Sequence, residues 1–544
     1  MSRPLRIALL LAICGVAFWW RLGYLGLIDP DEPFYAQTTR EMLQAHDWVT
    51  PRIFGQPQFE KPILIYWLSM GSFRLFGASE FAARVPAALF ATLLVFMTWA
   101  FASRLLGRRT GFLSAVVLAT GVEFIISARM MLTDMVFAAF VCGSAFSLWF
   151  AAREERLRER WFLAACALSG LAVLTKGPLG LLLPLFALAA LLVRRARPLP
   201  ARPASIALGL AIFAVIALPW YAIMLRMYGS QYFDSFFLHE NVGRFFHAEH
   251  PSNNHFYYYL VVLAGGSIPW MPVLAVLVRR ARDAALWSEL PRFLTVWGLL
   301  CLVFFTLAAS KLPSYALFLF VPLSILIGHA LAALLDGGAR DRVEVWGMGA
   351  LGLVQAAAFL VAPRLTPYAV LAWPLGLVGG CLAIAFLLQT WRVSVPWVAV
   401  SAAAAPALVV ACLGWAGPTL DDILSARSLA GTIAGDVRAS EPVMASPILA
   451  RGVLYYSHHP VTVLSGRARP FYTPHPLPVV VGADGLTRYL GEKGSALCAL
   501  TARDWARLRP GLPPGRWTVQ DTCGDKVLAR VSAAPGSPPG SPTP

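Results

Sequence analysis

Acidic side chains gather in a short polar segment near the N-terminus of this chain. Asp29-Pro30-Asp31-Glu32 places three carboxylates within four residues, directly before the helix-like sequence Pro33-Phe34-Tyr35. Acidic residues at the N-cap and a proline in the first turn favour the start of a helix. Capping needs only one such side chain, so Asp31 and Glu32 are candidates for chemistry as well as for capping.

Two further polar segments carry a lysine beside aromatic residues. Glu60-Lys61-Pro62 precedes an apolar stretch, and Ser310-Lys311-Leu312-Pro313-Ser314-Tyr315 lies between two apolar runs. A lysine at a membrane edge can hold a phosphate headgroup as a point charge. The alternatives are a solvated Glu60–Lys61 pair and, for Lys311 and Tyr315, simple anchoring at the membrane interface.

Asp134 and Lys176 lie at the ends of apolar runs. An ionisable residue at membrane depth is a functional candidate. An Arg129–Asp134 ion pair is an equal alternative for Asp134, and Lys176 could be a lone lysine that extends to the interface.

Histidines and carboxylates occur together in the segment 225–256. The motif His239-Glu240-Asn241-Val242-Gly243-Arg244 is followed by His247, His250 and His255. Imidazole and carboxylate groups can bind a divalent metal such as Zn, Mg or Mn. The spacing matches no compact signature such as H-E-x-x-H, so the pattern does not by itself indicate a metal.

The amino-acid composition indicates which class of protein holds these candidate residues. Apolar residues make up 58% of the 544 residues and charged residues 14%, with a mean hydropathy of +0.63. Soluble domains carry roughly a quarter charged residues, so we expect a polytopic membrane protein and exclude a cytosolic enzyme, a secreted disulfide scaffold and a disordered chain. The net charge of +16 resides in short arginine clusters, which is typical of cytoplasmic loops and not of nucleic-acid binding.

Thirteen apolar windows approach the roughly 20 residues that a spanning helix needs. They lie at 5–24, 83–103, 111–128, 132–152, 161–175, 177–193, 204–224, 257–278, 293–309, 315–335, 345–362, 368–390 and 396–416. Arginines in alternate connections predict a cytoplasmic N-terminus. The loops 25–82 and 225–256 and the C-terminal segment are then expected on the opposite, periplasmic side.

The chain is expected to divide into a membrane domain, 1–418, and a small α/β domain, 419–532. Helical periodicity around 422–439 alternates with strand-like runs at Val453–Tyr456, Val461–Leu464 and Pro478–Val481.

The C-terminal segment also contains two cysteines in polar sequence and a tail of low sequence complexity. Cys498 and Cys523 lie in polar sequence, and we expect a disulfide between them outside the membrane; the alternative is two buried thiols. Residues 533–544, rich in Pro, Gly and Ser, are expected to be a disordered tail.

The candidate residues share one predicted side of the membrane. They are Asp31, Glu32, Glu60, Lys61, Asp134, Lys176, His239, Arg244, Lys311 and Tyr315. A transporter is expected to place ionisable residues near the bilayer midplane, whereas an enzyme acting on lipid headgroups needs them at the edge. The sequence contains no Walker A motif or Rossmann fingerprint, so we expect no nucleotide and a lipid-linked donor.

Six motifs resemble the phospholipid-carrier-dependent glycosyltransferases, the group of the protein O-mannosyltransferases and the aminoarabinose transferases of lipid A. They are DPDEPFYA, FEKP-ILIYW, RVPAAL, the aspartate in MMLTD, HENVGRF and SKLPSY. The resemblance covers roughly residues 5–420 and implies a GT-C fold, interfacial helices in the first outer loop and a C-terminal periplasmic domain. It also implies inverting transfer of a sugar from undecaprenyl (polyprenyl) phosphate to an envelope acceptor, such as lipid A or another lipid or glycan, at the bacterial inner membrane.

The resemblance further implies roles for single residues. Asp31 is the main catalytic candidate, as a general base if the acceptor is a hydroxyl and as a positioning group if it is a phosphate. Asp134 matches the second aspartate of the family. Lys61 and Arg244 match positions expected to hold the carrier phosphate as it leaves.

Three other positions match family residues, and two depart from them. Tyr315 matches the tyrosine of the K-x-P-x-Y turn, while Glu60 and His239 resemble a possible metal pair. Aminoarabinose transferases typically carry an arginine where this chain has Phe34, and often a tyrosine where it has Gln58. Sugar and acceptor therefore stay open: transfer to a protein hydroxyl is an alternative, and a lipid-linked sugar flippase or a non-catalytic membrane anchor are readings of different classes.

Overall fold

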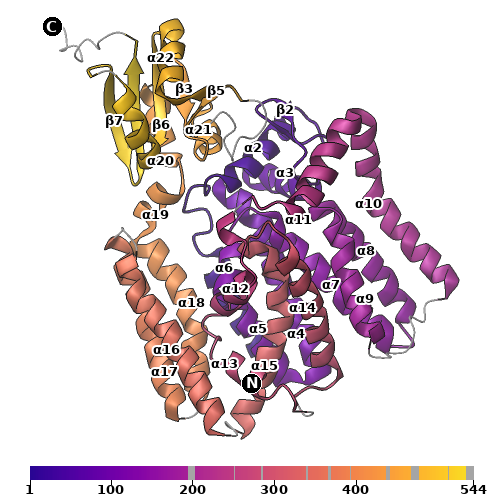
Figure 1. The fold of residues 1–544 in the computed structure, drawn as a ribbon. Helices are drawn as coiled ribbons and strands as arrows, with labels where there is room; N and C mark the ends of the chain where they lie inside the picture. Colours follow the sequence, from indigo (N-terminus) through magenta and orange to yellow (C-terminus); the bar gives the residue numbers. More distant parts are fainter. Residues whose placement is uncertain are drawn as a thin grey trace. The chain divides into compact units, whose positions relative to one another are not determined.

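The computed structural model describes residues 1–193, 202–249, 251–283, 286–337, 341–365, 369–391, 394–436, 441–466, 477–512 and 514–533. The chain divides into two compact units (Figure 1). The first, here called the membrane unit, comprises Met1–Leu22, Phe59–Leu68 and Arg84–Trp415. The second, the sheet unit, comprises Gly23–Gln58, Ser69–Ala83 and the chain from Ala416 onward.

Within the described residues, seven helical stretches are long and apolar enough to cross a membrane. They are α4 (Glu80–Leu106), α7 (Thr133–Arg153), the stretch Pro203–Phe246 that begins with α10 (Pro203–Tyr232), α14 (Glu289–Leu307), the stretch Pro313–Gly337 that contains η4 (Pro313–Leu319) and α15 (Phe320–Gly337), the first 20 residues of α16 (Arg342–Leu365), and α18 (Val395–Trp415). An eighth crossing results if α5 (Arg108–Ala119) and α6 (Val122–Ala128), which meet at a bend of 64°, form one span. The chain is a multi-pass membrane protein.

The predicted count of thirteen spans is not confirmed, although every predicted window coincides with helix. Window 257–278 is interrupted: α12 (Tyr258–Gly266) and α13 (Val273–Arg279) are separated by a stretch containing Pro269 and Pro272, which lack the backbone donor that a continuing helix needs. Window 5–24 holds α1 (Arg3–Cys14) and a π-helical turn, η1 (Gly15–Trp19). The apolar parts of α9 (Leu179–Val193) and α17 (Ala372–Trp391) are shorter than 18 residues.

Helix α7 is the most enclosed of these spans, with 89% of its apolar window buried inside the protein. It packs against α8 (Arg158–Lys176) and α9. The Ser144 hydroxyl on α7 lies 3.0 Å from the carbonyl oxygen of Ala165 and 3.1 Å from the Ser169 hydroxyl on α8. Small hydroxyl residues let helices approach closely and hydrogen-bond across the contact, which joins the middle of α7 to the middle of α8.

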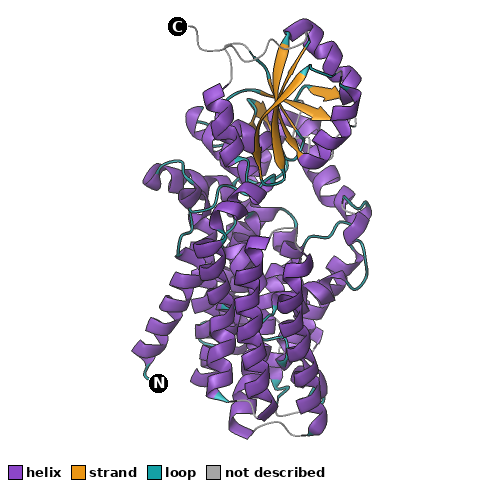
Figure 2. Ribbon diagram, turned by 90° about the vertical axis from the view of Figure 1, so that its left-hand side faces the viewer, coloured by secondary structure: helices purple, strands orange, loops and turns teal. Residues whose placement is uncertain are grey.

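The sheet unit contains a six-stranded sheet in the order β5-β4-β3-β6-β8-β7. The strands are β3 (Val443–Ala445), β4 (Val461–Ser465), β5 (Val479–Val481), β6 (Ser495–Thr501), β7 (Trp517–Cys523) and β8 (Lys526–Ser532). β3 to β6 are parallel to one another, and β8 and β7 complete the sheet in antiparallel pairing. Figure 2 shows these strands between helices.

Alternating side chains of the strands build two cores, one on each face of the sheet. α20 (Arg427–Asp436) and α21 (Ala450–Ser457) cover the first face through Leu429 and Val453. α22 (Gly482–Lys493) and α23 (Ala502–Leu508) cover the second through Leu490 and Trp505. The predicted small α/β architecture of this segment is confirmed.

The local predictions in this unit had mixed outcomes. The strands expected at 461–464 and 478–481 are β4 and β5. The strand expected at Val453–Tyr456 was wrong: the segment belongs to α21, because Leu449, Ala450 and Val453 form a helical apolar face against the sheet. The helix expected around 422–439 is divided between the end of α19 (Gly417–Leu424) and α20. The predicted tail, from 534 on, lies outside the described residues.

The predicted Cys498–Cys523 disulfide was also wrong. Both cysteines are free thiols. Cys498 on β6 belongs to the core with α22, whereas Cys523 on β7 packs against the core with α20, so they contact opposite faces of the sheet. Of the two alternatives, free thiols are the one observed, with Cys498 buried and Cys523 half-buried.

Candidate functional site

Helix ends and connecting segments of the membrane unit bring together most of the predicted site residues. Lys61 precedes α3 (Leu64–Phe76), Asp134 lies in the first turn of α7, and Lys176 is the last residue of α8. Arg244 begins α11 (Arg244–Phe246) and Tyr315 lies in η4. These side chains thus come from the ends of helices and from the segments that connect them.

Asp134 and Lys176 form an ion pair. Both side chains are largely buried, with 9% and 13% of their surfaces exposed. The Lys176 ammonium also lies 4.4 Å from the centre of the Tyr315 ring and 5.6 Å from that of Phe137. A cation between a carboxylate and aromatic faces is stabilised by both, so these residues form one group.

The expected alternatives for this region were therefore wrong. Arg129 donates its guanidinium hydrogens to the carbonyls of Phe18 and Trp20, at 3.2 and 3.0 Å, and does not pair with Asp134. Arg129 thus satisfies carbonyl groups at the end of η1 that a helix end leaves without partners. Lys176 is not a lone lysine at the interface, because Asp134 neutralises it.

Lys61 and Arg244 converge on one carboxylate oxygen. Nζ of Lys61 and one guanidinium nitrogen of Arg244 each lie 3.0 Å from Oε2 of Glu240. The Arg244 guanidinium also donates to Oε1 of Glu249, at 2.9 Å. Two cations that share a single anionic oxygen form a site that an anionic phosphate oxygen could occupy in the place of Glu240.

Sequence reasoning did not select Glu240 or Glu249. Glu240 could have been found, since it precedes Arg244 by four residues, the spacing at which helical side chains of opposite charge meet. Glu249 carries no comparable sequence signal, because its contact with Arg244 depends on how the chain turns after α11.

Glu123 was also missed. It lies in the first turn of α6, half-buried, with the Ser127 hydroxyl 3.4 Å from its Oε1. Its position inside the apolar window 111–128 was a usable signal, because an acid within a predicted span is a functional candidate.

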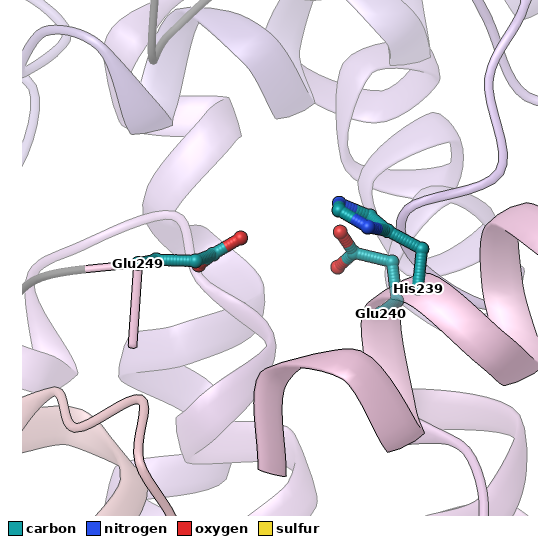
Figure 3. Close-up of side chains that lie close together, drawn as sticks. All are labelled: His239, Glu240 and Glu249. Carbon is teal, nitrogen blue, oxygen red and sulfur yellow. The ribbon is translucent and has the colours of Figure 1, made fainter. Parts of the chain in front are cut away.

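His239, Glu240 and Glu249 form a candidate metal centre. One possible ligand atom from each lies within 4.8 Å of the others. Figure 3 shows His239 and Glu240 projecting from one helix and Glu249 facing them from another segment. One imidazole and two carboxylates suit Zn or Mn, but both carboxylates also pair with Arg244. Glu60, the predicted partner of His239, is not part of this group.

Lys311 is held inside the protein. Its side chain is buried and its ammonium donates to Oδ1 of Asn254, at 2.6 Å. Nδ2 of Asn253 donates in turn to the carbonyl of Lys311, at 3.2 Å. These bonds tie the turn before η4 to the segment 251–255, which gives Lys311 a structural role; headgroup binding by Lys311 stays a prediction.

Asp31 and Glu32 belong to the sheet unit, where α2 (Asp31–Gln44) begins at Asp31. Glu32 is fully buried and its Oε2 accepts a hydrogen bond from the backbone N–H of Ile28, at 2.8 Å, which ties the first turn of α2 to the segment before it; no side-chain cap is formed at the start of this helix. Asp31 is exposed. The two adjacent acids thus differ in exposure: Glu32 is buried, whereas the Asp31 carboxylate is accessible to a substrate.

Comparison with known proteins begins with a family model. The model described as dolichyl-phosphate-mannose-protein mannosyltransferase matches residues 60–222.

Curated relatives match over a longer part of the chain. The chain is 34% identical, over 359 residues, to undecaprenyl phosphate-alpha-4-amino-4-deoxy-L-arabinose arabinosyl transferase 2 of Pseudomonas fluorescens (strain Pf0-1), covering 65% of this chain and 63% of that protein. It is also 34% identical, over 377 residues, to the transferase of the same description from Pseudomonas aeruginosa (strain LESB58), covering 66% of each. The chain thus spans slightly less than two thirds of these relatives' lengths.

Solved structures match nearly the whole chain. The crystal structure of ArnT from Cupriavidus metallidurans in the apo state superimposes with a TM-score of 0.76 at 25% identity, covering 98% of this chain and 99% of that one. The structure of the same protein bound to undecaprenyl phosphate gives 0.77 at 24% identity, with 99% and 100% covered. The predicted fold, a helical polytopic membrane protein of GT-C type with a small C-terminal α/β domain, is confirmed.

Proposed function

We propose that the chain is a glycosyltransferase of GT-C type, because it is similar to a protein mannosyltransferase family model and to aminoarabinose transferases in sequence and in structure. It takes a sugar from an undecaprenyl (polyprenyl) phosphate carrier and transfers it, with inversion, to an acceptor in the bacterial envelope. The observation that carries this proposal is the convergence of Lys61 and Arg244 on the single Oε2 atom of Glu240. Relatives are named for undecaprenyl phosphate, the carrier that such a pair of cations suits.

The carrier phosphate replaces Glu240 as the partner of Lys61 and Arg244. When the bond between the sugar carbon and the phosphate oxygen breaks, negative charge grows on the phosphate. Cations already held in place stabilise that charge without reorganising. Glu249 keeps Arg244 oriented during the exchange, because it contacts the other side of the guanidinium.

Asp31 is the proposed catalytic acid–base residue, and Asp134 a second carboxylate for the same reaction. A hydroxyl acceptor needs a base to remove its proton, and exposed Asp31 can take it. A phosphate acceptor needs no deprotonation, and Asp31 then orients it. Asp134 is held by Lys176 and serves as a fixed acceptor of hydrogen bonds from a sugar.

The proposed sugar follows the names of the relatives, and the proposed acceptor follows the resemblance of the motifs. We favour 4-amino-4-deoxy-L-arabinose, the sugar in the names of the matched relatives, and a lipid A phosphate as its acceptor. A second candidate, mannose transfer to a protein hydroxyl, is favoured by the description of the matched family model. No nucleotide or nucleic acid takes part in either proposal.

The proposal includes a divalent metal near the carrier phosphate. His239, with either predicted Glu60 or the neighbouring Glu240 and Glu249, would hold Zn, Mg or Mn, and the metal would add positive charge at the phosphate.

The protein resides in the inner membrane among membrane lipids. Its N-terminus faces the cytoplasm and its C-terminal domain the periplasm, as the arginines of the α4–α5 connection indicate.

Purified protein in lipid nanodiscs tests the proposal. It is incubated with undecaprenyl phosphate carrying either aminoarabinose or mannose, and with lipid A or a serine- and threonine-containing peptide. Mass spectrometry should detect one added sugar on one acceptor, and Lys61→Met should abolish the addition. Movement of the intact carrier across vesicle membranes without any transfer would establish a flippase instead.

A further inference from the structure

The acidic segment 24–32 is fastened to the C-terminal part of the chain within the sheet unit. The backbone N–H of Gly26 donates to Oδ1 of Asp421 at 2.5 Å. That of Leu27 donates to the Tyr456 hydroxyl at 2.7 Å, and that of Asp29 to the Leu424 carbonyl at 2.9 Å. Three backbone N–H groups in the segment before Asp31 therefore donate to acceptors in α19 or α21.

A second set of hydrogen bonds and ion pairs, centred on Arg427 and Glu80, also holds this segment. The Tyr456 hydroxyl lies 3.1 Å from Oε1 of Glu80, and Arg427 pairs with both Glu80 and Asp421, at 3.3 and 2.7 Å. Arg427 also donates to the carbonyl of Tyr24, at 3.1 Å. Partly buried ion pairs and hydrogen bonds to charged groups are each stronger than exposed neutral ones, so the segment is held at both of its ends.

Helix α2, which Asp31 begins, contacts α21 through two arginines. The Arg451 guanidinium lies 4.5 Å from the centre of the Phe34 ring, one turn after Asp31. Arg40 lies 3.7 Å from the centre of the Tyr455 ring and donates to the Tyr455 carbonyl at 2.8 Å. These contacts fix the direction of α2 as well as the loop before it.

Asp29 and Gly452 form the tightest point of this contact. Oδ2 of Asp29 accepts a hydrogen bond from the backbone of Ala426 at 2.8 Å, and its carboxylate is buried against Gly452. A methyl group on Gly452 would lie 2.9 Å from Cγ of Asp29. A Cβ does not fit at that separation, so an alanine at this position would displace the Asp29 carboxylate from its hydrogen bond with Ala426.

We propose that the C-terminal α/β domain positions Asp31 for the transfer reaction, with Gly452, Tyr456 and Arg451 as positioning residues on α21. The Asp31 side chain is exposed, and the bonds to α19, α20 and α21 hold the backbone segment that leads into it. A reacting group displaced by about 1 Å can lose about 100-fold in rate. The inference rests on the proposed function for its kinetic part, and the physical attachment is testable without it.

Gly452→Ala is the test variant and Gly431→Ala its matched control. Gly431 lies in α20 of the same unit, where an added methyl group meets nothing within 4 Å. In full-length protein, Gly452→Ala should lower kcat about 100-fold and leave the KM for the lipid-linked donor within about twofold, since Lys61 and Arg244 are unchanged. Gly431→Ala should keep wild-type kcat. Wild-type kcat in Gly452→Ala would overturn the proposal, as would a loss confined to KM.

Hydrogen–deuterium exchange of residues 24–32 gives a readout that does not need activity. Exchange should rise in Gly452→Ala and stay at the wild-type level in Gly431→Ala. Tyr456→Phe should act like Gly452→Ala, while Tyr489→Phe, on α22 against the other face of the sheet, should not. Unchanged exchange in both α21 variants would overturn the attachment. If wild type transfers no sugar, the proposed function fails, and the exchange comparison still decides whether α21 holds this segment.

Discussion

Lys176, the last residue of α8, pairs with Asp134 in the first turn of α7 across 42 positions of sequence. The Tyr315 ring lies against the same ammonium. Three residues from separate apolar runs thus form one buried group in the membrane unit. Asp134 compensates the charge of the buried Lys176 ammonium, and the pair gives the carboxylate a fixed direction.

Asp134→Asn should therefore destabilise the protein. Removal of one partner of a buried ion pair costs about 3–5 kcal/mol, because the remaining charge is left without compensation. Adding Lys176→Met to Asp134→Asn should recover part of the loss. Thermal unfolding of the detergent-solubilised protein measures both effects, and a wild-type Tm in Asp134→Asn would contradict a stabilising pair.

Lys61→Met and Arg244→Gln should each weaken binding of undecaprenyl phosphate. Hydrogen bonds to charged groups contribute about 1.5–3 kcal/mol, so we expect Kd to rise at least about tenfold. In buffer that contains EDTA, so that no divalent metal is bound, Glu240→Gln should lower Kd, because it removes the anion that competes with the phosphate.

The control for these variants is Arg279→Gln. Arg279 pairs with Asp341 in the same unit and is half exposed. Binding of the fluorescently labelled carrier in nanodiscs gives Kd for all four variants. Equal affinities in Lys61→Met and Arg279→Gln would remove Lys61 from the phosphate site.

Asp29 should make the stability of the protein depend on pH. Burial raises the pKa of its carboxyl well above the ordinary value of 3.8, even though Lys526 and Arg451 lower it. Between that value and the raised pKa, the folded protein binds more protons at Asp29 than the unfolded chain does. The contribution of Asp29 to the free energy of unfolding therefore falls as pH rises through this window.

Asp29→Asn removes this dependence and keeps an oxygen that can accept from Ala426. The Tm of the variant minus that of wild type should increase as pH rises from the ordinary carboxyl pKa of 3.8 towards the raised one. Differential scanning fluorimetry across that range measures the difference. A constant difference would mean that Asp29 has no raised pKa in the folded protein.

The two thiols of the sheet unit should react differently. Burial raises the pKa of Cys498 to about 12, whereas Cys523 is half-buried. Maleimide should modify Cys523 in the folded protein and Cys498 only after denaturation, because reaction needs an accessible thiolate. Peptide mass spectrometry locates the label, and a Cys498–Cys523 linked peptide would contradict the free thiols.

Hydropathy alone predicted a window over each described helical stretch that is long and apolar enough to span a bilayer, but it also predicted further spans that the structure does not confirm. It did not predict the break at Pro269 and Pro272, since local backbone chemistry divides an apolar window without changing its composition. It likewise assigned 453–456 to a strand, where packing against the sheet selects a helix.

The motifs predicted most site residues but not their partners. Asp134 and Lys176 were each recognised, yet their pairing depends on how α7 and α8 pack. The attachment of the segment around Asp31 to α21 joins residues more than 400 positions apart. No periodicity or spacing in the sequence indicates such a contact, because it is set by the folding of one unit from segments near both ends of the chain.

Mass spectrometry of envelope lipids and glycans tests the central claim most directly. Cells with the wild-type protein, a deletion and Asp31→Asn are compared. The account predicts that one acceptor loses a sugar-sized mass in the deletion and in Asp31→Asn alike, with the variant still inserted in the membrane. An envelope that changes in the deletion but stays at wild type in Asp31→Asn would contradict the catalytic assignment of Asp31.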